Sequence, residues 1–277
     1  MDSRSTTIAG IRQYYGTRGG VWKNPHAMKL LVKALAIGLI AAGIGVVAGR
    51  MLAPQPKPIP TDPLGKLQYG NEQFAKGTVT TPKADEMTRY QLETEGQRPF
   101  AVVVSCSDSR VPPEIIFNQG LGDLFVVRVA GNIVNEENLA SIEYAVEHLK
   151  ASLIVVLGHT HCGAVKAAVS GKHLKGHLPH LVAHIEPVIR QLRHTHPHLK
   201  DDALVERVIQ ENVRHTIRVI LERSEIVRKQ YEVGKVQFAG GVYHLREGKV
   251  EWLKLPEGME GNAHAEKSAK EASHSGH

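Results

Sequence analysis

Cysteine is scarce in this sequence, and its scarcity limits the chemistry that the chain can perform. The 277 residues include only two cysteines, Cys106 and Cys162. A framework of several disulfides is therefore excluded, and the pair can form one bridge, remain as two thiols, or serve as two metal ligands. Aromatic residues are also few, at 5%, whereas 42% of the residues are hydrophobic and 22% are charged. This composition indicates a globular core and excludes collagen-like or wholly disordered chains.

The sequence also lacks a basic stripe along its folded part. The formal net charge is +6, but the excess is concentrated near the N-terminus, at Arg4, Arg12, Arg18, Lys23, Lys29 and Lys33. The remainder is close to neutral, whereas a nucleic-acid-binding surface needs cations clustered on the folded body. We therefore expect no nucleic-acid partner.

An apolar run follows the basic arm of residues 1–29. Residues 34–49 carry no charged side chain, and the wider segment 30–53 is long enough for a helix that crosses a membrane, which needs about 20 residues. The positive-inside rule places the arm in the cytoplasm and the rest of the chain on the outer side, in a periplasm or an equivalent lumen. The alternatives are a cleaved signal segment, which would give a secreted form, and a buried soluble helix.

Composition divides the rest of the chain into three parts. Residues 54–63 are rich in proline and indicate a stiff linker. Residues 64–255 have the patterns of one folded domain, whereas residues 256–277 lack aromatics and are rich in small, charged and histidine residues. We expect this last part to be a disordered tail.

The folded part alternates strand and helix patterns. Residues 100–105, 124–130 and 153–158 are short, valine-rich runs typical of strands covered on both faces. Residues 138–150 place their apolar side chains on one helical face, and a long helix is expected to start with Asp201 and Asp202 as caps and to end before Gly234. A hairpin is expected at residues 236–245 and 250–253. The sequence therefore predicts an α/β fold, with a mostly parallel central sheet flanked by helices, after the transmembrane or signal segment.

Chemically distinctive residues follow two of the predicted strands. Cys106 comes directly after the first strand, and His159 and Cys162 come at the end of the third. Ligands in parallel α/β folds bind at the carboxyl ends of the strands. Two thiolates, an imidazole and a fourth oxygen ligand suit a tetrahedral zinc ion, so we expect one zinc per chain. A structural disulfide and two unconnected buried thiols are the alternatives.

Asp108 and Arg110 lie just beyond the first of these cysteines. Two thiolates neutralise the charge of zinc, so a bound water is acidified less than by three neutral histidines and needs further help. The Asp108 carboxylate can take the proton of that water while the Arg110 guanidinium keeps the carboxylate ionised and oriented. Alternatively, Asp108 occupies the fourth zinc position and closes the site, or the two residues form an ordinary local ion pair.

The sequence closely resembles the beta-class carbonic anhydrases. The resemblance spans residues 64–253, and its motifs are Cys106-Ser-Asp-Ser-Arg-Val-Pro-Pro113, Gly122-Asp-Leu-Phe-Val-Val-Arg-Val-Ala-Gly-Asn132, Ser141-Ile-Glu-Tyr144 and Gly158-His-Thr-His-Cys-Gly-Ala164. It implies zinc held by Cys106, His159 and Cys162, and a catalytic pair of Asp108 and Arg110. The implied reaction is the reversible hydration of carbon dioxide to bicarbonate and a proton. The resemblance also implies a homodimer or a dimer of dimers.

Four substrate-binding residues follow from the same resemblance. Gln97 is similar to the amide that binds substrate oxygen, and Phe125 and Tyr144 are similar to the aromatics that narrow the CO2 pocket across a dimer interface. Gly163 resembles the residue whose backbone N–H meets substrate. The family's bicarbonate-inhibited members carry a tryptophan where this chain has Val103, so we expect no inhibitory bicarbonate pocket of that kind.

Histidines are unusually frequent between residues 173 and 198. They are His173, His177, His180, His184, His194, His196 and His198. With His161, they are candidates for a proton relay or an extra metal site. Because Gly176 and Pro179 interrupt the helical spacing, we favour a polar surface.

Two other functions use the same residues. Hydrolysis of a linear CO2 analogue, carbonyl sulfide or carbon disulfide, needs the same nucleophile and differs in pocket access. A non-catalytic, zinc-stabilised membrane scaffold would need only the four ligands, and the presence of Asp108, Arg110 and Gln97 argues against it.

Overall fold

The structure, a computed structural model, describes residues 26, 29–30, 33–34, 58–79 and 84–256. Contacts divide the chain into two units, Met1–Pro58 and Ile59–His277. In the first unit, the described residues 26, 29–30 and 33–34 are helical and exposed. Most of the predicted anchor at 30–53, and all of the predicted tail at 256–277 except residue 256, lie outside the described residues. None of the helices in the described residues is both long enough and apolar enough to cross a membrane.

A five-stranded sheet organises the second unit, in the order β2-β1-β3-β4-β5. Its strands are β1 Ala101–Ser105, β2 Leu124–Arg128, β3 Leu153–His159, β4 Gln237–His244 and β5 Lys249–Leu253. The first four strands are parallel, and only β5 runs antiparallel to its neighbour. Every residue of β1 and β3 is buried, because both strands lie inside the sheet and are covered on both faces. The predicted α/β fold with a mostly parallel sheet is confirmed.

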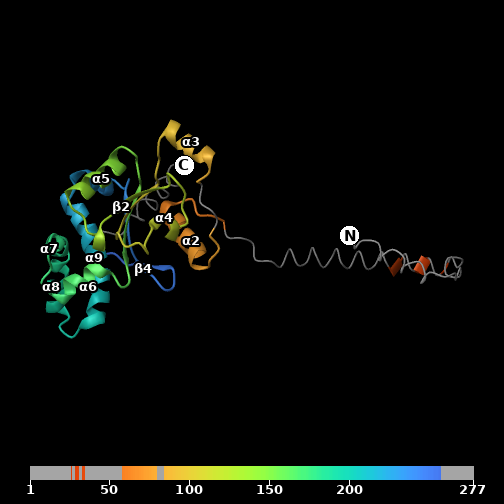
Figure 1. The fold of residues 1–277 in the computed structure, drawn as a ribbon. Helices are drawn as coiled ribbons and strands as arrows, with labels where there is room; N and C mark the ends of the chain where they lie inside the picture. Colours follow the sequence, from red (N-terminus) through yellow and green to blue (C-terminus); the bar gives the residue numbers. More distant parts are fainter. Residues whose placement is uncertain (1–25, 27–28, 31–32, 35–57, 80–83, 257–277) are drawn as a thin grey trace, which may run out of the picture. The chain divides into compact units, whose positions relative to one another are not determined.

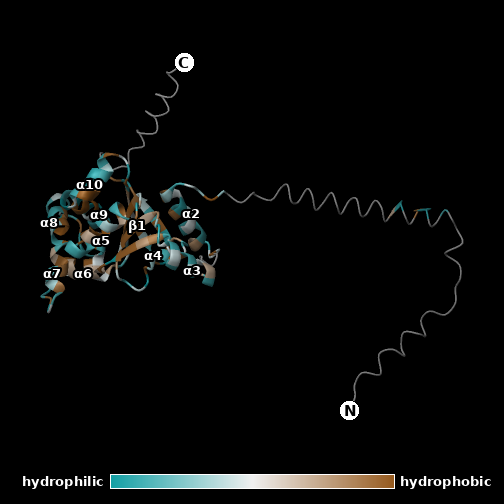
Figure 2. Ribbon diagram, turned by 90° about the horizontal axis from the view of Figure 1, so that it is seen from above, coloured by the Kyte–Doolittle hydropathy of each residue, from teal (hydrophilic) through white to brown (hydrophobic). Residues whose placement is uncertain are grey.

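Helices cover the two faces of the sheet unequally (Figure 1). The smaller cover consists of α2 Pro63–Ala75 and α4 Pro113–Ile116, and α3 Glu86–Glu95 lies at the same side. The larger cover consists of α5 Glu136–Glu147, α6 Gly163–Ser170, α7 Leu178–Ala183, α8 Glu186–Thr195, α9 Asp201–Arg223 and α10 Glu225–Glu232. Figure 2, seen from above, shows β1 between these two groups. Alternate residues of β1 therefore enter two separate cores, Val102 and Val104 on the α9 side and Val103 on the α2 side.

The predicted helix at residues 138–150 forms, but with shifted ends. α5 begins two residues earlier, because the Asn135 side chain accepts a hydrogen bond from the Asn138 N–H while the Asn138 side chain accepts one from the Asn135 N–H. It ends before Lys150, whose φ of 60° is outside the helical region. A capping box made of two asparagines is harder to recognise in a sequence than the common Ser/Thr and Glu pattern.

The predicted long helix after residue 200 is wrong in two details. Asp201 and Asp202 do not cap α9. The cap is Lys200, which makes no side-chain cap bond, and both acids lie in the first turn, where their negative charges interact favourably with the helix dipole. Gly234 follows α10 rather than α9, because the chain breaks at Ser224. The Ser224 hydroxyl accepts from the Val227 N–H and donates to Glu143 of α5, so the break fixes α10 against α5.

Candidate functional site

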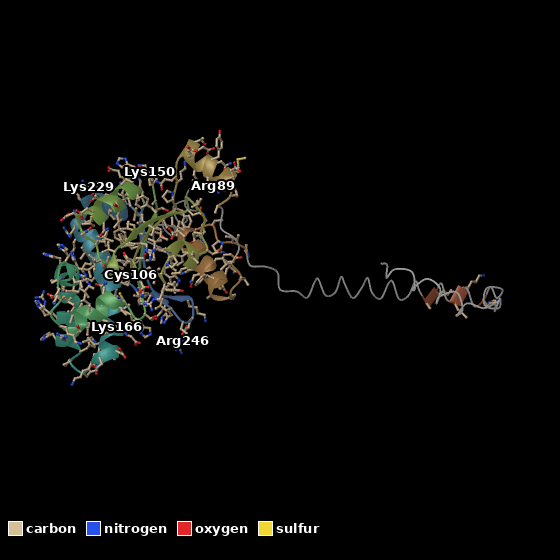
Figure 3. The ribbon with its side chains drawn as sticks, in the orientation of Figure 1. Arg89, Cys106, Lys150, Lys166, Lys229 and Arg246 are labelled. Carbon is tan, nitrogen blue, oxygen red and sulfur yellow. The ribbon has the colours of Figure 1, made fainter. Side chains whose placement is uncertain are left out.

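Pairing of β1 with β3 brings the two predicted halves of the site together. Ser105, the last residue of β1, is paired with Leu157 of β3, so Cys106 leaves the sheet beside the end of β3 at His159. Cys162 follows as the residue preceding α6. Figure 3 shows Cys106 in the interior of the domain, whereas the labelled lysines and arginines lie at its outside.

Cys106, His159 and Cys162 form a compact group of possible metal ligands. One nitrogen or sulfur atom of each side chain lies within 4.8 Å of those of the other two. The residues are almost fully buried, with exposures of 4%, 0% and 1%. Within the described part of the chain, this is the one group of three or more side chains placed to hold a metal ion.

His159 shows why this group suits a metal. Its Nδ1 lies 3.0 Å from the carbonyl oxygen of Thr160, so Nδ1 carries the proton and Nε2 presents its lone pair. Nε2 is buried and makes no hydrogen bond within the described structure. A buried polar atom without a partner costs about 1–3 kcal/mol, and a metal ion removes that cost. One imidazole with two cysteine sulfurs is a donor set that zinc favours.

The two sulfurs also affect each other's protonation. A hydrogen bond from the Cys162 thiol lowers the pKa of Cys106, and the same bond raises the pKa of Cys162 because it retains the proton. The N–H of Gly131 acts on Cys106 in the same downward direction, against its burial. One hydrogen bond between the sulfurs therefore moves the two pKa values in opposite directions, as expected of two thiols that lie side by side.

Asp108 and Arg110 lie next to this group. Arg110 donates from Nε to Asp108 Oδ1 at 2.9 Å and from Nη2 to Oδ2 at 2.7 Å. This contact holds the pKa of Asp108 well below its usual value. Oδ2 also lies 3.9 Å from Nε2 of His159, so an ionised carboxylate faces the space beside the possible ligands. Both carboxylate oxygens are bonded to Arg110, and Asp108 is not a member of the ligand group.

Arg128, which the sequence analysis did not select, fixes the loop that carries these residues. Its Nε donates to the carbonyl oxygen of Cys106 at 3.0 Å, and its Nη2 donates to that of Asp108 at 2.7 Å. In the sequence, Arg128 stands out only as a cation at the end of an apolar strand. The order of the strands explains its contact with the loop. Because β2 is paired directly with β1, its last residue lies beside the loop after β1.

The predicted substrate-binding residues are not gathered around Cys106 within one chain. Gln97 is exposed and precedes β1, at the opposite end of the strand from Cys106. Phe125 is paired with Val102, four residues before Cys106, or about 13 Å along a strand. Its ring contacts that of Tyr144 with centroids 6.3 Å apart, and Tyr144 is 48% exposed. Gly163 alone is adjacent, because it follows Cys162 at the start of α6.

The histidines between residues 173 and 198 lie largely on the surface. Only His184 and His196 are partly buried, and ring contacts link His177 with His180 and His196 with His198. No three of the histidines described in this region converge on a common metal position. The polar surface that we favoured agrees with this placement, whereas the proton relay stays a prediction.

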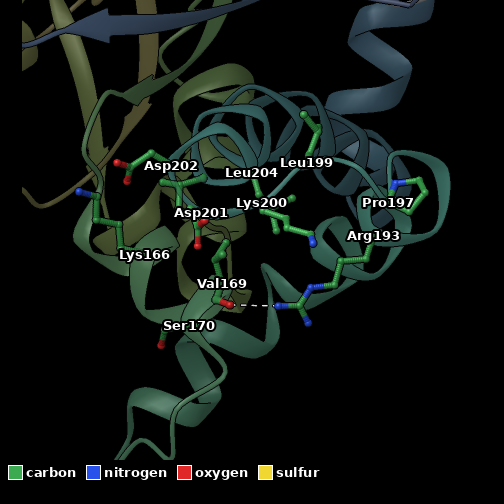
Figure 4. Close-up of a pocket in the computed structure, with 11 residues that line it drawn as sticks. Lys166, Val169, Ser170, Arg193, Pro197, Leu199, Lys200, Asp201, Asp202 and Leu204 are labelled. Carbon is green, nitrogen blue, oxygen red and sulfur yellow. Dashed lines mark hydrogen bonds between the residues drawn. The ribbon is translucent and has the colours of Figure 1, made fainter.

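A cavity of about 720 Å3 lies away from the cysteines (Figure 4). It is bounded by the end of α6, the end of α8 and the start of α9, and Arg193 crosses it to donate to the carbonyl oxygen of Val169 at 3.1 Å. Its charged side chains, Lys166, Arg193, Lys200, Asp201 and Asp202, are all exposed. It contains none of the possible metal ligands, so its size does not make it the reaction site.

Comparison with known proteins agrees with the geometry around the cysteines. Residues 101–250 match a family model described as carbonic anhydrase. The carbonic anhydrase of Mycolicibacterium smegmatis is 40% identical over 189 residues, which cover 67% of this chain and 89% of that protein. Among solved structures, the Coccomyxa beta-carbonic anhydrase in complex with acetazolamide has a TM-score of 0.58 and 26% identity, covering 77% of this chain and 99% of its own. A tetrameric beta-carbonic anhydrase of Sordaria macrospora has a TM-score of 0.55 and 28% identity, covering 60% and 91%.

Proposed function

The chain belongs to the beta-class carbonic anhydrases and is a carbonate dehydratase, and we propose that Cys106, His159 and Cys162 bind the zinc ion on which its hydration of CO2 depends. The observation that carries the proposal is the convergence of these three buried side chains, within 4.8 Å of one another, beside the Asp108–Arg110 pair. When bound, zinc supplies the Lewis acidity that makes a water nucleophilic near neutral pH.

Asp108 and Arg110 supply the proton chemistry in this proposal. The Asp108 carboxylate stays ionised because Arg110 lowers its pKa, so it is available to accept a hydrogen bond from a water beside His159. Arg110 fixes the direction of that hydrogen bond, and Arg128 fixes the loop through the carbonyl oxygens of Cys106 and Asp108. The attacking oxygen is thus oriented by the protein before CO2 arrives.

Substrate binding requires a second copy of the chain in this proposal. Gln97, Phe125 and Tyr144 lie too far from Cys106 to line its surroundings in one chain. The side of the domain that carries them has an open strand edge at β2, and α3 beside it buries none of its residues. Met87 and Tyr90 of α3 are 64% and 61% exposed, as expected of side chains that a second copy covers. The Sordaria enzyme is tetrameric, and we propose a homodimer or a dimer of dimers here.

We also propose that residues 30–53 anchor the enzyme in a membrane, with the catalytic domain on the outer side. The support is the charge-free run at residues 34–49 and the cations that precede it. Carbonate extraction of membranes tests this directly. Retention of the full-length chain supports an anchor, release of the full-length chain contradicts it, and release of a shortened chain indicates a cleaved signal.

The function is tested by stopped-flow CO2 hydration with the full chain in detergent, with zinc determined on the same sample. Asp108→Asn should lose on the order of 100-fold or more in turnover, because a neutral amide loses the charge that pairs with Arg110 and is a weaker acceptor for the hydrogen of the water. Ser107→Ala, a change at an exposed residue of the same loop, should leave turnover unchanged. Zinc at one per chain with no hydration contradicts the assignment, and carbonyl sulfide and carbon disulfide would then be assayed as substrates.

A further inference from the structure

Two buried polar side chains interrupt the apolar face of α9. Asn212 is 0% exposed and Thr216 is 2% exposed, and they lie one helical turn apart. Their neighbours on this face are aliphatic residues of the core: Val205, Val208, Ile209, Val213, Ile217 and Ile220. Burying an amide and a hydroxyl in such a face is costly unless each finds a hydrogen-bond partner. Their partners therefore indicate what they do.

Both side chains donate to the same turn. Asn212 Nδ2 donates to the carbonyl oxygen of Gly131 at 2.8 Å, and Thr216 Oγ1 donates to that of Asn132 at 3.1 Å. These carbonyls belong to the short helix η1, Ala130–Asn132, which follows β2. The turn is closed by a hydrogen bond from the Asn132 N–H to the carbonyl oxygen of Val129, at 2.9 Å. α9 thus holds the two carbonyl groups that the turn directs toward it.

The opposite side of this turn contacts a possible metal ligand. The N–H of Gly131 donates to Sγ of Cys106 at 3.2 Å. The turn that directs this N–H at the sulfur has an unusual backbone, with φ values of 77° at Gly131 and 45° at Asn132. A side chain at Gly131 would be strained at this φ and would also meet Ile185 and Ala164 at 3.1 and 3.2 Å. The turn is therefore held on three sides, by its glycine, by α9 and by the sulfur.

We propose that Asn212 and Thr216 are positioning residues of the metal centre: by fixing the turn at residues 130–132, they aim the Gly131 N–H at the Cys106 sulfur and so set how strongly that sulfur binds the metal. The inference rests on the zinc site proposed above. A hydrogen bond to a thiolate withdraws electron density from sulfur, and groups of this kind tune both the affinity and the electronic properties of metal sites. Neither residue touches the ligand, so each acts through the turn.

The variants are chosen to keep the shape of the core. Thr216→Val removes the hydroxyl and keeps the volume, and Asn212→Leu removes the amide at similar size. Thr216→Ser retains the hydroxyl and should behave as the wild type. Ile220→Val is the matched control, because it removes one methylene from the same face of α9, one turn beyond Thr216, without touching the turn.

Two measurements on the full chain separate this proposal from a merely structural role. The first is the rate of zinc release to a chelator, which we expect to rise about tenfold in Thr216→Val and in Asn212→Leu. A turn that is no longer fixed stops holding the Cys106 sulfur in the position that the metal needs, and this outweighs the stronger donation by a sulfur that has lost its hydrogen bond. The second is the absorption of the cobalt-substituted protein. Loss of the hydrogen bond raises the energy of the sulfur lone pairs, so the sulfur-to-cobalt band should move to longer wavelength in both variants. Neither measurement should change in Thr216→Ser or Ile220→Val.

Each outcome of these measurements supports or overturns the proposed role of Asn212 and Thr216. A wild-type cobalt band that does not move in Thr216→Val, with zinc release within twofold of the wild type, overturns the inference and leaves the metal site intact. Equal acceleration in Ile220→Val overturns it as well, because general loosening of the core would then account for the effect. If the wild type shows no sulfur-to-cobalt band, the proposed metal site fails together with the inference. Should Asn212→Leu fail to fold, Thr216→Val alone decides between these outcomes.

Discussion

The guanidinium of Arg110 donates hydrogen bonds to both carboxylate oxygens of Asp108, at 2.9 and 2.7 Å, and the backbone N–H of Arg110 donates to Oδ1 at 3.0 Å. The two residues are neighbours on one loop, so this contact forms without help from the rest of the fold. Its position is set elsewhere, because Arg128 at the end of β2 holds the loop beside His159. Orientation and position of the carboxylate therefore have separate causes, and separate variants address them.

Replacing Arg110 with lysine tests the orientation. Lysine keeps the charge but offers a point donor in place of the planar fork, so the carboxylate should rotate more freely. We expect kcat/KM for CO2 hydration to fall by roughly 10–100-fold, with zinc unchanged at one per chain. Stopped-flow rates and metal analysis of the same sample check this, with Arg190→Lys at an exposed position of α8 as the control. Unchanged turnover would mean that charge alone is sufficient.

Replacing Arg128 with methionine tests the position. Two carbonyl groups of the loop lose their donor, and we expect the free energy of unfolding to fall by about 1–2 kcal/mol. Turnover should fall too, because Asp108 is no longer fixed beside His159. Urea denaturation and CO2 hydration measure the two effects. Arg246→Met, at an exposed arginine of the turn between β4 and β5, should change neither, and a variant that loses stability but keeps full activity would contradict the positional role.

Removing the metal should expose the two thiols to each other. Their sulfurs lie within 4.8 Å, so a chelated sample treated with a mild oxidant should form a bond between Cys106 and Cys162. Thiol titration should then fall from two groups per chain to none, whereas zinc-loaded protein should keep both. Reduction followed by zinc should restore activity. Cys106→Ser serves as the control because it cannot form the internal bridge, and only intermolecular bridges in the wild type would argue against the placement of the sulfurs.

Acidification should destabilise the fold through His215. Burial lowers its pKa below the usual 6.5, with Arg218 and His184 acting in the same direction and Glu222 opposing them. Between the folded pKa and 6.5 the unfolded chain binds more protons, so stability is complete above about pH 6.5 and falls as the pH drops through this window. His215→Gln should flatten the pH dependence of the urea midpoint, and His180→Gln, at an exposed position, should not. Parallel curves for wild type and His215→Gln would refute this role.

The sequence indicates the proposed metal ligands because the ends of the strands can be predicted from it. Valine-rich runs predict β1 and β3, and residues that follow parallel strands gather at one edge of the sheet, so Cys106 and His159 could be expected to meet. The Asp108–Arg110 contact is local and is predictable for the same reason that turns are. Gln97, Phe125 and Tyr144 came from the family resemblance alone, and one chain does not bring them to the cysteines.

The supporting contacts could not be predicted, because they join residues far apart in the sequence. Asn212 and Thr216 resemble ordinary polar residues of a long helix, and only the packing of α9 against η1 shows that they hold Gly131 and Asn132. The break at Ser224 is not predictable for a similar reason. It depends on the hydrogen bond to Glu143 of α5, which no local pattern contains.

The pairing of β1 with β3 has a consequence for the order in which the protein matures. Cys106 leaves one strand and His159 ends the other, and β2 and α5 lie between them in the chain. The ligands can therefore meet only after a slow, non-local pairing of parallel strands. A cation cannot nucleate this domain as it nucleates a zinc finger, whose ligands are close in sequence. If these residues bind zinc as we propose, the newly made chain folds before it acquires the metal, and until then its two cysteines remain open to oxidation.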